Sequence, residues 1–262
     1  MPPLTAILIA YNEEVDLPRA LASLQSVADE IVLVDSGSTD RTCEIARSFG
    51  AQVYSRKLDG FAEQKNFAAA RAMNDWILCI DCDQELSPEL RASLLAWKRQ
   101  TPDKNAYEIL QLSNYLGGWI RHSGWYPEYR TLLYRRDRAK FVGALHERVE
   151  AEGAPGRLEG HLFHYTIQTL AEHRAKIDAM STLAAEDMLA RGRKSWLPAM
   201  IFAPPWTVIQ RLVFQLGVLD GRRGWLIAWM SARHIYVKYR KLGRLRAGEK
   251  LTRRSWPNPG EA

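Results

Sequence analysis

The sequence LTAILIAYNEE, residues 4–14, is a short apolar run that ends abruptly in polar residues. Its apolar part, 4–10, includes β-branched side chains and is too short for a buried helix, which predicts a buried strand. Two further runs of this kind, EIVLVD at 30–35 and DWILCID at 75–81, both end in aspartate. We therefore expect the fold to depend on buried strands whose carboxyl ends carry polar side chains.

Helical segments separate these strands and give the first hundred residues a regular alternation. Apolar residues recur at helical spacing in 15–27, a capping signal and a closing glycine delimit 39–50, and a Ser-Pro cap opens 87–99. A strand is also expected at 51–55 and a helix at 62–73. This alternation predicts an open α/β fold of the nucleotide-binding type, with a parallel sheet covered by helices on both faces.

The alternation ends after residue 105. Three strands and then one long amphipathic helix are expected there, at 106–112, 130–136, 158–165 and 168–192. The sequence therefore predicts a domain over residues 1–167 and a helical extension over 168–262.

Composition is that of an ordinary folded protein, but charge is unevenly distributed. Of 262 residues, 47% are hydrophobic and 25% are charged, which excludes disordered, collagen-like and coiled-coil chains. Residues 1–100 carry 10 basic and 15 acidic side chains, whereas 101–262 carry 26 and 15. Three cysteines are too few for a disulfide framework and indicate a reducing compartment. The first residues resemble neither a signal peptide nor an anchor.

Carboxylates gather where the predicted strands end. Ligands of parallel sheets bind beyond the carboxyl ends of the strands, so the residues after the first, second and fourth strands should converge on one crevice. Asp81 and Asp83 suit a hard divalent cation shared with a diphosphate; alternatively, Asp81 caps a turn and Asp83 is solvated. Asp35 could accept a hydrogen bond from a nucleotide base or could serve its own turn. Glycine-rich GxGxxG and GxxxxGK[ST] loops are absent from the sequence, so a metal is expected to hold the phosphates.

These segments resemble, in order and spacing, the N-terminal signatures of the family 2 glycosyltransferases, which have a GT-A type fold. The matching segments are ILIAYNEE (7–14), VDSGSTDRT (34–42), GFAEQKN (60–66) and CIDCDQEL (79–86). Three later segments are similar to bacterial lipopolysaccharide inner-core glycosyltransferases: RTLLYRRDRAKFVGALHERV (130–149), GHLFHYT (160–166) and KYRKL (238–242). The resemblance implies a mostly parallel nucleotide-binding sheet with flanking helices and a basic helical C-terminal extension. The domain over 1–167 would be catalytic, with a donor half (1–100) and an acceptor half (101–167).

The resemblance also implies a metal-dependent hexosyltransferase with a nucleotide-sugar donor, a UDP-sugar being favoured, and a divalent cation, Mg²⁺ or Mn²⁺. The residues implied in donor binding are Tyr11, Asn12, Glu13, Asp35, Lys65 and Asp81. The first three would line the nucleoside pocket, Asp35 would contact the base and Lys65 would lie near the diphosphate. The implied metal ligands are Asp83, Asp81 and a C-terminal histidine, for which we take His164.

Inverting family members use a carboxylate base from an acidic pair, and the matching place in this chain is His146-Glu147. A single displacement needs one base within hydrogen-bond reach of the acceptor hydroxyl, and the metal replaces a general acid at the leaving diphosphate. We favour Glu147 as the base, with His146 as the alternative. The two residues could instead be a surface pair before a strand.

Aromatic and arginine side chains between residues 115 and 130 are candidates for acceptor binding. Aromatic faces pack on sugars, and arginines bind carboxylates or phosphates bidentately. The candidates are Trp119, Arg121, Trp125 and Arg130. The alternative is that the aromatic side chains belong to the core.

The C-terminal part is both apolar and basic. Residues 196–219 are apolar but contain three prolines, which are expected to interrupt the segment and argue against a membrane span. Residues 222–254 hold 11 basic side chains and one acidic one. A segment lying in the membrane interface beside anionic headgroups is favoured over a helical hairpin packed on the catalytic domain. Nucleic acid is not expected as a partner, because its recognition motifs are absent from the sequence.

The expected function is transfer of a sugar to a lipid-borne glycan, the lipopolysaccharide inner core, by a peripheral enzyme on the cytoplasmic face of the plasma membrane. Two alternatives remain. One is a glycosyltransferase that acts on polyprenyl phosphate. The other is a catalytically silent membrane scaffold that binds a nucleotide sugar.

Overall fold

The computed structural model describes residues 1–143, 147–193 and 196–251, and the chain divides into two compact units. The first unit comprises Met1–Leu112 and Glu128–Tyr165, and the second comprises Ser113–Pro127 and Thr166–Ala262. The segment Ser113–Pro127 thus belongs with the C-terminal helices. The division of function between 1–167 and 168–262 stays a prediction.

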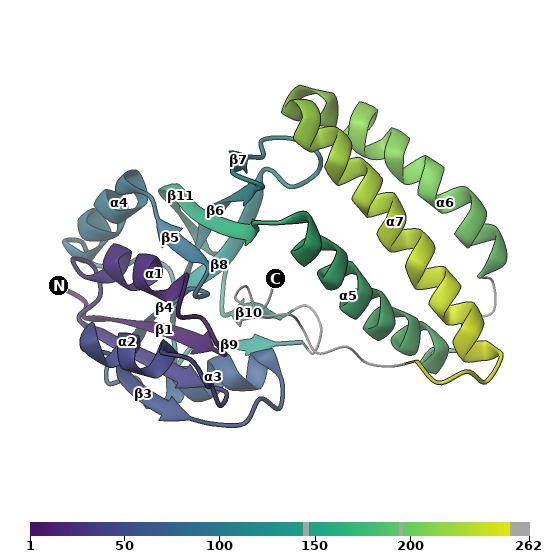
Figure 1. Cartoon of the computed structure of the whole chain (residues 1–262). Helices are drawn as coiled ribbons and strands as arrows, with labels where there is room; N and C mark the ends of the chain where they lie inside the picture. Colours follow the sequence, from purple (N-terminus) through teal and green to yellow (C-terminus); the bar gives the residue numbers. More distant parts are fainter. Residues whose placement is uncertain (144–146, 194–195, 252–262) are drawn as a thin grey trace. The chain divides into compact units, whose positions relative to one another are not determined.

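Strands and helices alternate through the first hundred residues (Figure 1). The elements are β1 (Leu4–Ala10), α1 (Leu17–Leu24), β2 (Glu30–Asp35), α2 (Thr42–Ser48), β3 (Gln52–Ser55), α3 (Phe61–Arg71), β4 (Trp76–Cys79), β5 (Gln84–Leu86) and α4 (Pro88–Lys98). Strands follow: β6 (Ala106–Tyr115), β7 (Gly118–Trp119), β8 (Glu128–Arg135), β9 (Ala139–Val142), β10 (Arg148–Ala151) and β11 (Gly156–Ile167). The α/β prediction is therefore confirmed.

The main sheet is mixed rather than mostly parallel. Its strand order is β3-β2-β1-β4-β8-β6-β11-β5, with β7 paired to β6. The pairs among β3, β2, β1 and β4 are parallel, whereas β8 pairs antiparallel with both β4 and β6, and β5 with β11. The difference follows from the connections: parallel neighbours need crossover helices, and no helix lies between α4 and residue 168 among the described residues.

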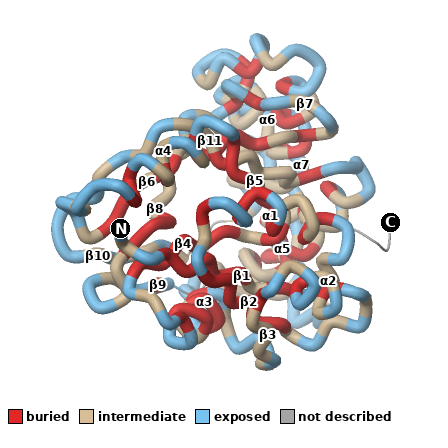
Figure 2. Tube along the Cα trace, turned by 90° about the vertical axis from the view of Figure 1, so that its left-hand side faces the viewer, coloured by how far each residue is buried: buried red, intermediate tan, exposed pale blue. Residues whose placement is uncertain are grey.

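Alternate side chains of the parallel strands enter two different cores. Leu4 and Leu8 of β1 pack with residues of α1 and α4 in one cluster, whereas Ile7 packs with residues of α3 in the other. This period of two is the geometry of a strand that is covered on both faces. Figure 2 shows buried residues along β1, β2 and β4. The helices on both faces therefore hold the strand ends in fixed positions.

The second unit is built on three long helices: α5 (Leu170–Ala190), α6 (Leu197–Ile209) and α7 (Gly221–Arg246). A capping box of Thr169 and Glu172 begins α5. Lys241 of α7 bonds the Asp178 carboxylate of α5 at 2.7 Å, so part of the basic C-terminal charge is structural. A π-helix, Gln210–Phe214, and a 3₁₀-helix, Gly217–Asp220, connect α6 to α7.

The prolines do not interrupt the apolar segment, contrary to the expectation from sequence. Pro198 lies in the first turn of α6, where backbone N–H groups have no helical partner, and α6 continues through Pro204 and Pro205. The Thr207 hydroxyl donates to the carbonyl of Ala203 at 2.8 Å, and the π-helix follows directly. Within the described residues, one stretch, Leu197–Phe214, is long and apolar enough to cross a membrane, and 6% of it is buried.

Gly160 of β11 allows a close approach to α4 and provides a test of the packing. Its φ is +94°, and a Cβ there would lie 2.3 Å from the backbone nitrogen of Leu90. We expect Gly160→Ala to lower the free energy of unfolding by more than about 2 kcal/mol, because backbone strain and a backbone clash add. Urea denaturation measures the loss.

Gly153→Ala is the matched control. Gly153 has a φ of +85°, and a Cβ added there would meet no atom of the described residues within 4 Å, so strain alone should cost about 1 kcal/mol. Equal losses in the two variants would contradict the importance of the contact with α4.

Candidate active site

Parallel pairing brings the ends of three strands to one edge of the sheet. β1 lies between β2 and β4, with Ala10 opposite Asp35 and Ile7 opposite Cys79. Asn12, with a φ of 54°, donates its backbone N–H to the Ser38 hydroxyl, and its side-chain oxygen accepts from the Thr39 N–H, each at 2.8 Å. The loops after β1 and β2 are therefore tied together.

Asp35 is buried and is engaged by its own turn. One carboxylate oxygen accepts from the N–H groups of Gly37 at 2.9 Å and Ser38 at 3.0 Å, and the other accepts from the Ser38 hydroxyl. The structure thus shows the turn-forming role, and contact with a base stays a prediction. Tyr11 is 48% exposed on the neighbouring loop.

Lys65 joins two carboxylates that are distant in sequence. This buried side chain of α3 places its Nζ 3.0 Å from Asp81 Oδ1 and 3.1 Å from Glu147 Oε1. Burial alone would lower the pKa of Lys65, but Asp81 and Glu147 outweigh it and the pKa is raised. Burial opposes ionisation of Asp81, whereas Lys65, His164 and Arg130 favour it, and the net effect is a lowered Asp81 pKa. Both ends of the Lys65–Asp81 pair are therefore charged at neutral pH.

A second group links Asp83 to the antiparallel half of the sheet. His164 Nε2 lies 3.0 Å from Asp83 Oδ2, and His164 Nδ1 lies 2.9 Å from the Gln111 amide nitrogen. With this amide orientation, Nδ1 accepts and Nε2–H donates to Asp83. A metal at Nε2 would require the other tautomer and a turned Gln111 amide.

Two glutamines were missed by the sequence reasoning. Gln84 accepts the Asp81 N–H at 2.9 Å, and its amide nitrogen lies 3.4 Å from Gln111. Both are buried. The sequence does contain features that could have identified both residues. Gln84 directly follows Asp83, and Gln111 is a polar residue within a predicted strand.

Glu13 lies among other carboxylates of this site and keeps its proton at neutral pH. Burial, and then repulsion from Asp83, Asp16 and Asp81, raise the pKa of Glu13 to about 8. Its backbone N–H donates to the Thr42 hydroxyl at 2.7 Å, which fixes its position. A crowded set of carboxylates that raises the pKa of one member is an environment in which a cation would be favourable.

The acids fit a cation that is shared with a ligand better than a cation held by protein alone. No group of three His, Cys, Asp or Glu side chains within 1–143, 147–193 and 196–251 could hold a metal by itself. Mg²⁺ commonly uses one or two carboxylates together with substrate phosphates and water. Asp81 and Asp83 suit that arrangement, and metal ligation by them and by His164 stays a prediction.

The remaining predicted site residues belong to different units of the chain. Trp119, Arg121 and Trp125 belong to the second unit, and Arg130 belongs to the first, where its charge acts on Asp81. Trp125 packs edge-on against Tyr115 at 5.5 Å between ring centroids. His146 lies outside the described residues. Acceptor binding by these side chains stays a prediction.

Comparison with known proteins shows that the chain is similar to one family of enzymes. A family model described as Glycosyl transferase family 2 matches residues 5–148. An uncharacterized glycosyltransferase of Rickettsia bellii is 32% identical over 204 residues, which cover 73% of this chain and 69% of that protein. The lipopolysaccharide core biosynthesis glycosyltransferase LpsC of Rhizobium meliloti is 29% identical over 90% of this chain and 93% of its own. Glucosyl-3-phosphoglycerate synthase from Mycobacterium tuberculosis aligns in structure over 45% of each chain, with 25% identity and a TM-score of 0.36.

The raised pKa of Glu13 predicts a pH-dependent gain in stability for Glu13→Gln. The folded chain keeps this proton up to about pH 8, whereas the unfolded chain loses it near the ordinary pKa of 4.5. Stability contributed by the protonated group is therefore complete below 4.5 and is lost as the pH rises toward 8. The variant lacks that loss, so its advantage in urea denaturation should grow over this range to a few kcal/mol.

Glu44→Gln is the control. Its hydrogen bond and ion pair with Arg41 lower the pKa of Glu44, so its removal should give no advantage that grows with pH. A Glu13→Gln advantage that is constant from pH 4.5 to pH 8 would contradict the crowding of carboxylates at the site.

Proposed function

This chain belongs to glycosyltransferase family 2, and we propose that it transfers a sugar from a nucleotide-sugar donor, a UDP-sugar being favoured, to a lipid-borne glycan. The observation that carries this proposal is the pairing of Lys65 with Asp81 and Glu147 at the carboxyl edge of the parallel strands. Similarity to LpsC along nearly the whole chain supports the lipopolysaccharide core as the acceptor, and we propose its inner part.

Donor binding is assigned to the loops after β1, β2 and β4. Tyr11 is exposed beside Asn12, and the hydrogen bonds of Asn12 hold its loop against the Asp35 turn. The nucleoside would bind to this pair of loops, with the diphosphate toward Asp81 and Asp83. Mg²⁺ or Mn²⁺ bound by these two carboxylates would offset the charge of the leaving diphosphate.

Glu147 is assigned as the base of an inverting displacement. Its side chain is 17% exposed, and Oε1 accepts the hydrogen bond of Lys65, so Oε2 is the atom that we assign to the acceptor hydroxyl. The acceptor oxygen forms a bond to the anomeric carbon while its proton moves to Oε2. The bond from that carbon to the diphosphate oxygen breaks, and the electron pair leaves with the diphosphate.

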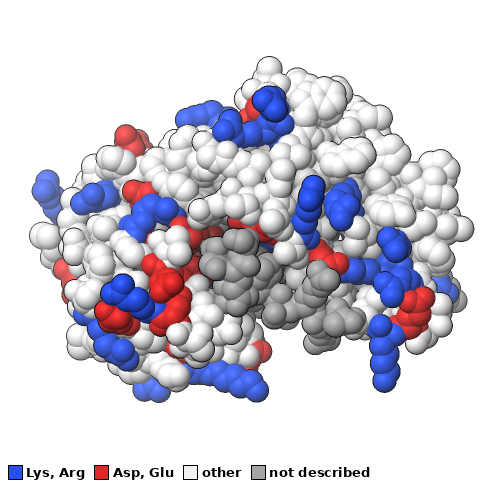
Figure 3. All heavy atoms as spheres, viewed as in Figure 1, with Lys and Arg blue, Asp and Glu red and all other residues white. Residues whose placement is uncertain are grey.

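Contact with a membrane surface is assigned to the second unit. Large apolar side chains are exposed on α6 and on the segments after it: Ile201, Phe202, Trp206, Phe214, Trp225 and Trp229. Figure 3 shows few charged side chains on the surface over α6. Exposed arginines of α7, such as Arg222, Arg233 and Arg240, are suited to anionic headgroups. We therefore propose peripheral attachment at the cytoplasmic face of the membrane.

Glu147→Gln tests the catalytic role and the function together. The amide cannot take the acceptor proton, so transfer should fall by about 10²–10⁴-fold while donor binding remains. Release of UDP is measured with UDP-sugars, Mn²⁺ and a lipopolysaccharide acceptor that lacks its outer sugars, and donor binding is measured by calorimetry.

Glu150→Gln, on the exposed strand β10, is the matched control and should transfer at the native rate. Native transfer by Glu147→Gln would overturn the assignment of the base. No transfer by the native chain with any donor would support the silent scaffold instead.

Phe202→Glu tests the membrane surface. Phe202 is 71% exposed in the protein, and its ring would be buried in the membrane on binding. Replacing it with glutamate should therefore weaken binding to vesicles of anionic phospholipid by about tenfold. Met73→Glu is the control, because Met73 is 72% exposed on the first unit. Equal sedimentation of the two variants with vesicles would exclude α6 as the contact.

A further inference from the structure

A row of polar side chains crosses the main sheet beside the two aspartates after β4. The strands β8, β6, β11 and β5 are neighbours in that order, and they carry Glu128, Gln111, His164 and Gln84. Gln111 lies directly opposite Glu128, and His164 lies directly opposite Gln84. Residues opposite each other in antiparallel strands share a face of the sheet, so these side chains are placed to bond one another. The proposed transfer reaction assigns no role to either glutamine.

A backbone group fixes the orientation of the Gln84 amide. The side-chain oxygen of Gln84 accepts the N–H of Asp81 at 2.9 Å, and a backbone N–H can only donate. The amide nitrogen of Gln84 lies 3.4 Å from Asp81 Oδ2 and 3.4 Å from Gln111 Oε1, and both of these atoms are acceptors. Gln84 is 4% exposed, so protein groups must satisfy its amide.

The Gln111 amide, which is 5% exposed, is oriented from two sides. Its oxygen faces the Gln84 donor, and its nitrogen lies 3.5 Å from Glu128 Oε2. A turned amide would set its oxygen against the Glu128 carboxylate and its nitrogen against the amide nitrogen of Gln84. Acceptor would then meet acceptor, and donor would meet donor. In the orientation that avoids both conflicts, the Gln111 nitrogen donates to His164 Nδ1 at 2.9 Å.

The direction of these bonds determines where the imidazole proton of His164 lies. A ring nitrogen that accepts a hydrogen bond carries no proton, so the proton lies on Nε2, which is 3.0 Å from Asp83 Oδ2. His164 therefore donates to the Asp83 carboxylate. A histidine nitrogen must be unprotonated to bind a metal, so Nε2 cannot be a ligand while the bonds run in this direction.

We propose that Gln111, whose amide is oriented by Gln84 and Glu128, is a positioning residue that keeps the His164 proton on Nε2, so that His164 orients Asp83 instead of binding the cation itself. Groups that hydrogen-bond the side chains around a metal determine their orientation, and losing such groups lowers metal affinity. The role of Asp83 as a metal ligand rests on the proposed function. The position of the His164 proton does not.

The ring nitrogens of His164 test the proposal in the full chain without donor or metal. Nitrogen NMR of the chain labelled with ¹⁵N-histidine distinguishes protonated from unprotonated ring nitrogens, and His164→Gln identifies the signals. The expected result is a protonated Nε2 and an unprotonated Nδ1. A proton on Nδ1, with or without one on Nε2, would overturn the proposal.

Gln111→Glu tests the glutamine itself. A carboxylate can only accept, so Nδ1 should become protonated and its signal should move to that of a protonated ring nitrogen. Gln100→Glu is the matched control, because Gln100 is exposed just after α4 and its variant should keep the native signals. An unprotonated Nδ1 in Gln111→Glu is incompatible with the proposal.

Gln111→Met decides the test if circular dichroism shows that Gln111→Glu is unfolded. This substitution removes the donor without adding a charge, so the Nδ1 signal should move to that of a nitrogen without a hydrogen bond. A native Nδ1 signal in Gln111→Met would refute the role of Gln111.

The consequence for the cation is measured with Mn²⁺ and UDP as probes. Pulsed electron paramagnetic resonance detects a ring nitrogen that is bound directly to Mn²⁺, and none from His164 is expected. Gln111→Met should weaken Mn²⁺ binding by about tenfold. A Mn²⁺-bound ring nitrogen that disappears in His164→Gln, or equal Mn²⁺ affinity of Gln111→Met and the native chain, would overturn the proposal. If Mn²⁺ and UDP do not bind at all, the proposed function fails, and the NMR signals still decide where the His164 proton lies.

Discussion

The ammonium group of Lys65, buried between Asp81 and Glu147, is the interaction on which the rest of the site depends. Glu147 is 82 residues from Lys65 in the chain, and a hydrogen bond of 3.1 Å brings them together. A buried cation without a partner is costly, and the Lys65 side chain is 5% exposed, whereas those of Asp81 and Glu147 are 42% and 17% exposed. Lys65 therefore requires its carboxylate partners, and this requirement links α3 to the end of β4 and to Glu147, directly before β10.

The neighbouring acids are not balanced in the same way. Asp83 is paired with His164, whereas burial and surrounding carboxylates raise the pKa of Glu13 to about 8. Such crowding of carboxyl groups lowers stability, but it suits a ligand that brings a cation. The proposed binding of a diphosphate together with Mg²⁺ or Mn²⁺ would offset the repulsion among these carboxylates. It agrees with the membership of the chain in glycosyltransferase family 2.

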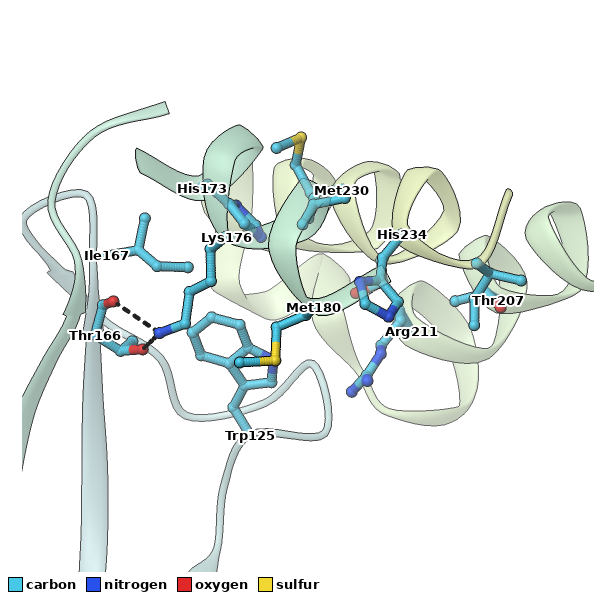
Figure 4. A pocket seen from close by; sticks show the side chains of 13 residues that line it. Trp125, Thr166, Ile167, His173, Lys176, Met180, Thr207, Arg211, Met230 and His234 are labelled. Atoms are coloured by element: carbon cyan, nitrogen blue, oxygen red, sulfur yellow. Dashed lines mark hydrogen bonds between the residues drawn. The ribbon is translucent and has the colours of Figure 1, made fainter. Parts of the chain in front are cut away.

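The second unit has a different relation between charge and apolar surface. The basic side chain of Lys241 forms an ion pair with Asp178 within the unit, whereas large apolar side chains of α6 are exposed. Between the helices, Arg211 and Lys176 line a cavity that also contains apolar side chains (Figure 4). The exposed apolar side chains suit contact with a membrane, where the lipid-borne acceptor that we propose would lie.

Local pattern alone determined the alternating strands and helices of the first hundred residues and the polar strand ends, because periodicity and capping act over a few residues. It could not determine the antiparallel half of the sheet, since pairing depends on contacts between distant segments. The same holds for the Gln111–His164–Asp83 chain and for Asp35, whose carboxylate is engaged by its own turn. The prolines of α6 misled as well: α6 continues through Pro204 and Pro205, although each proline removes one backbone donor. Only the tertiary structure decided these points, because burial determines which polar groups must find partners and folding determines which partners are near.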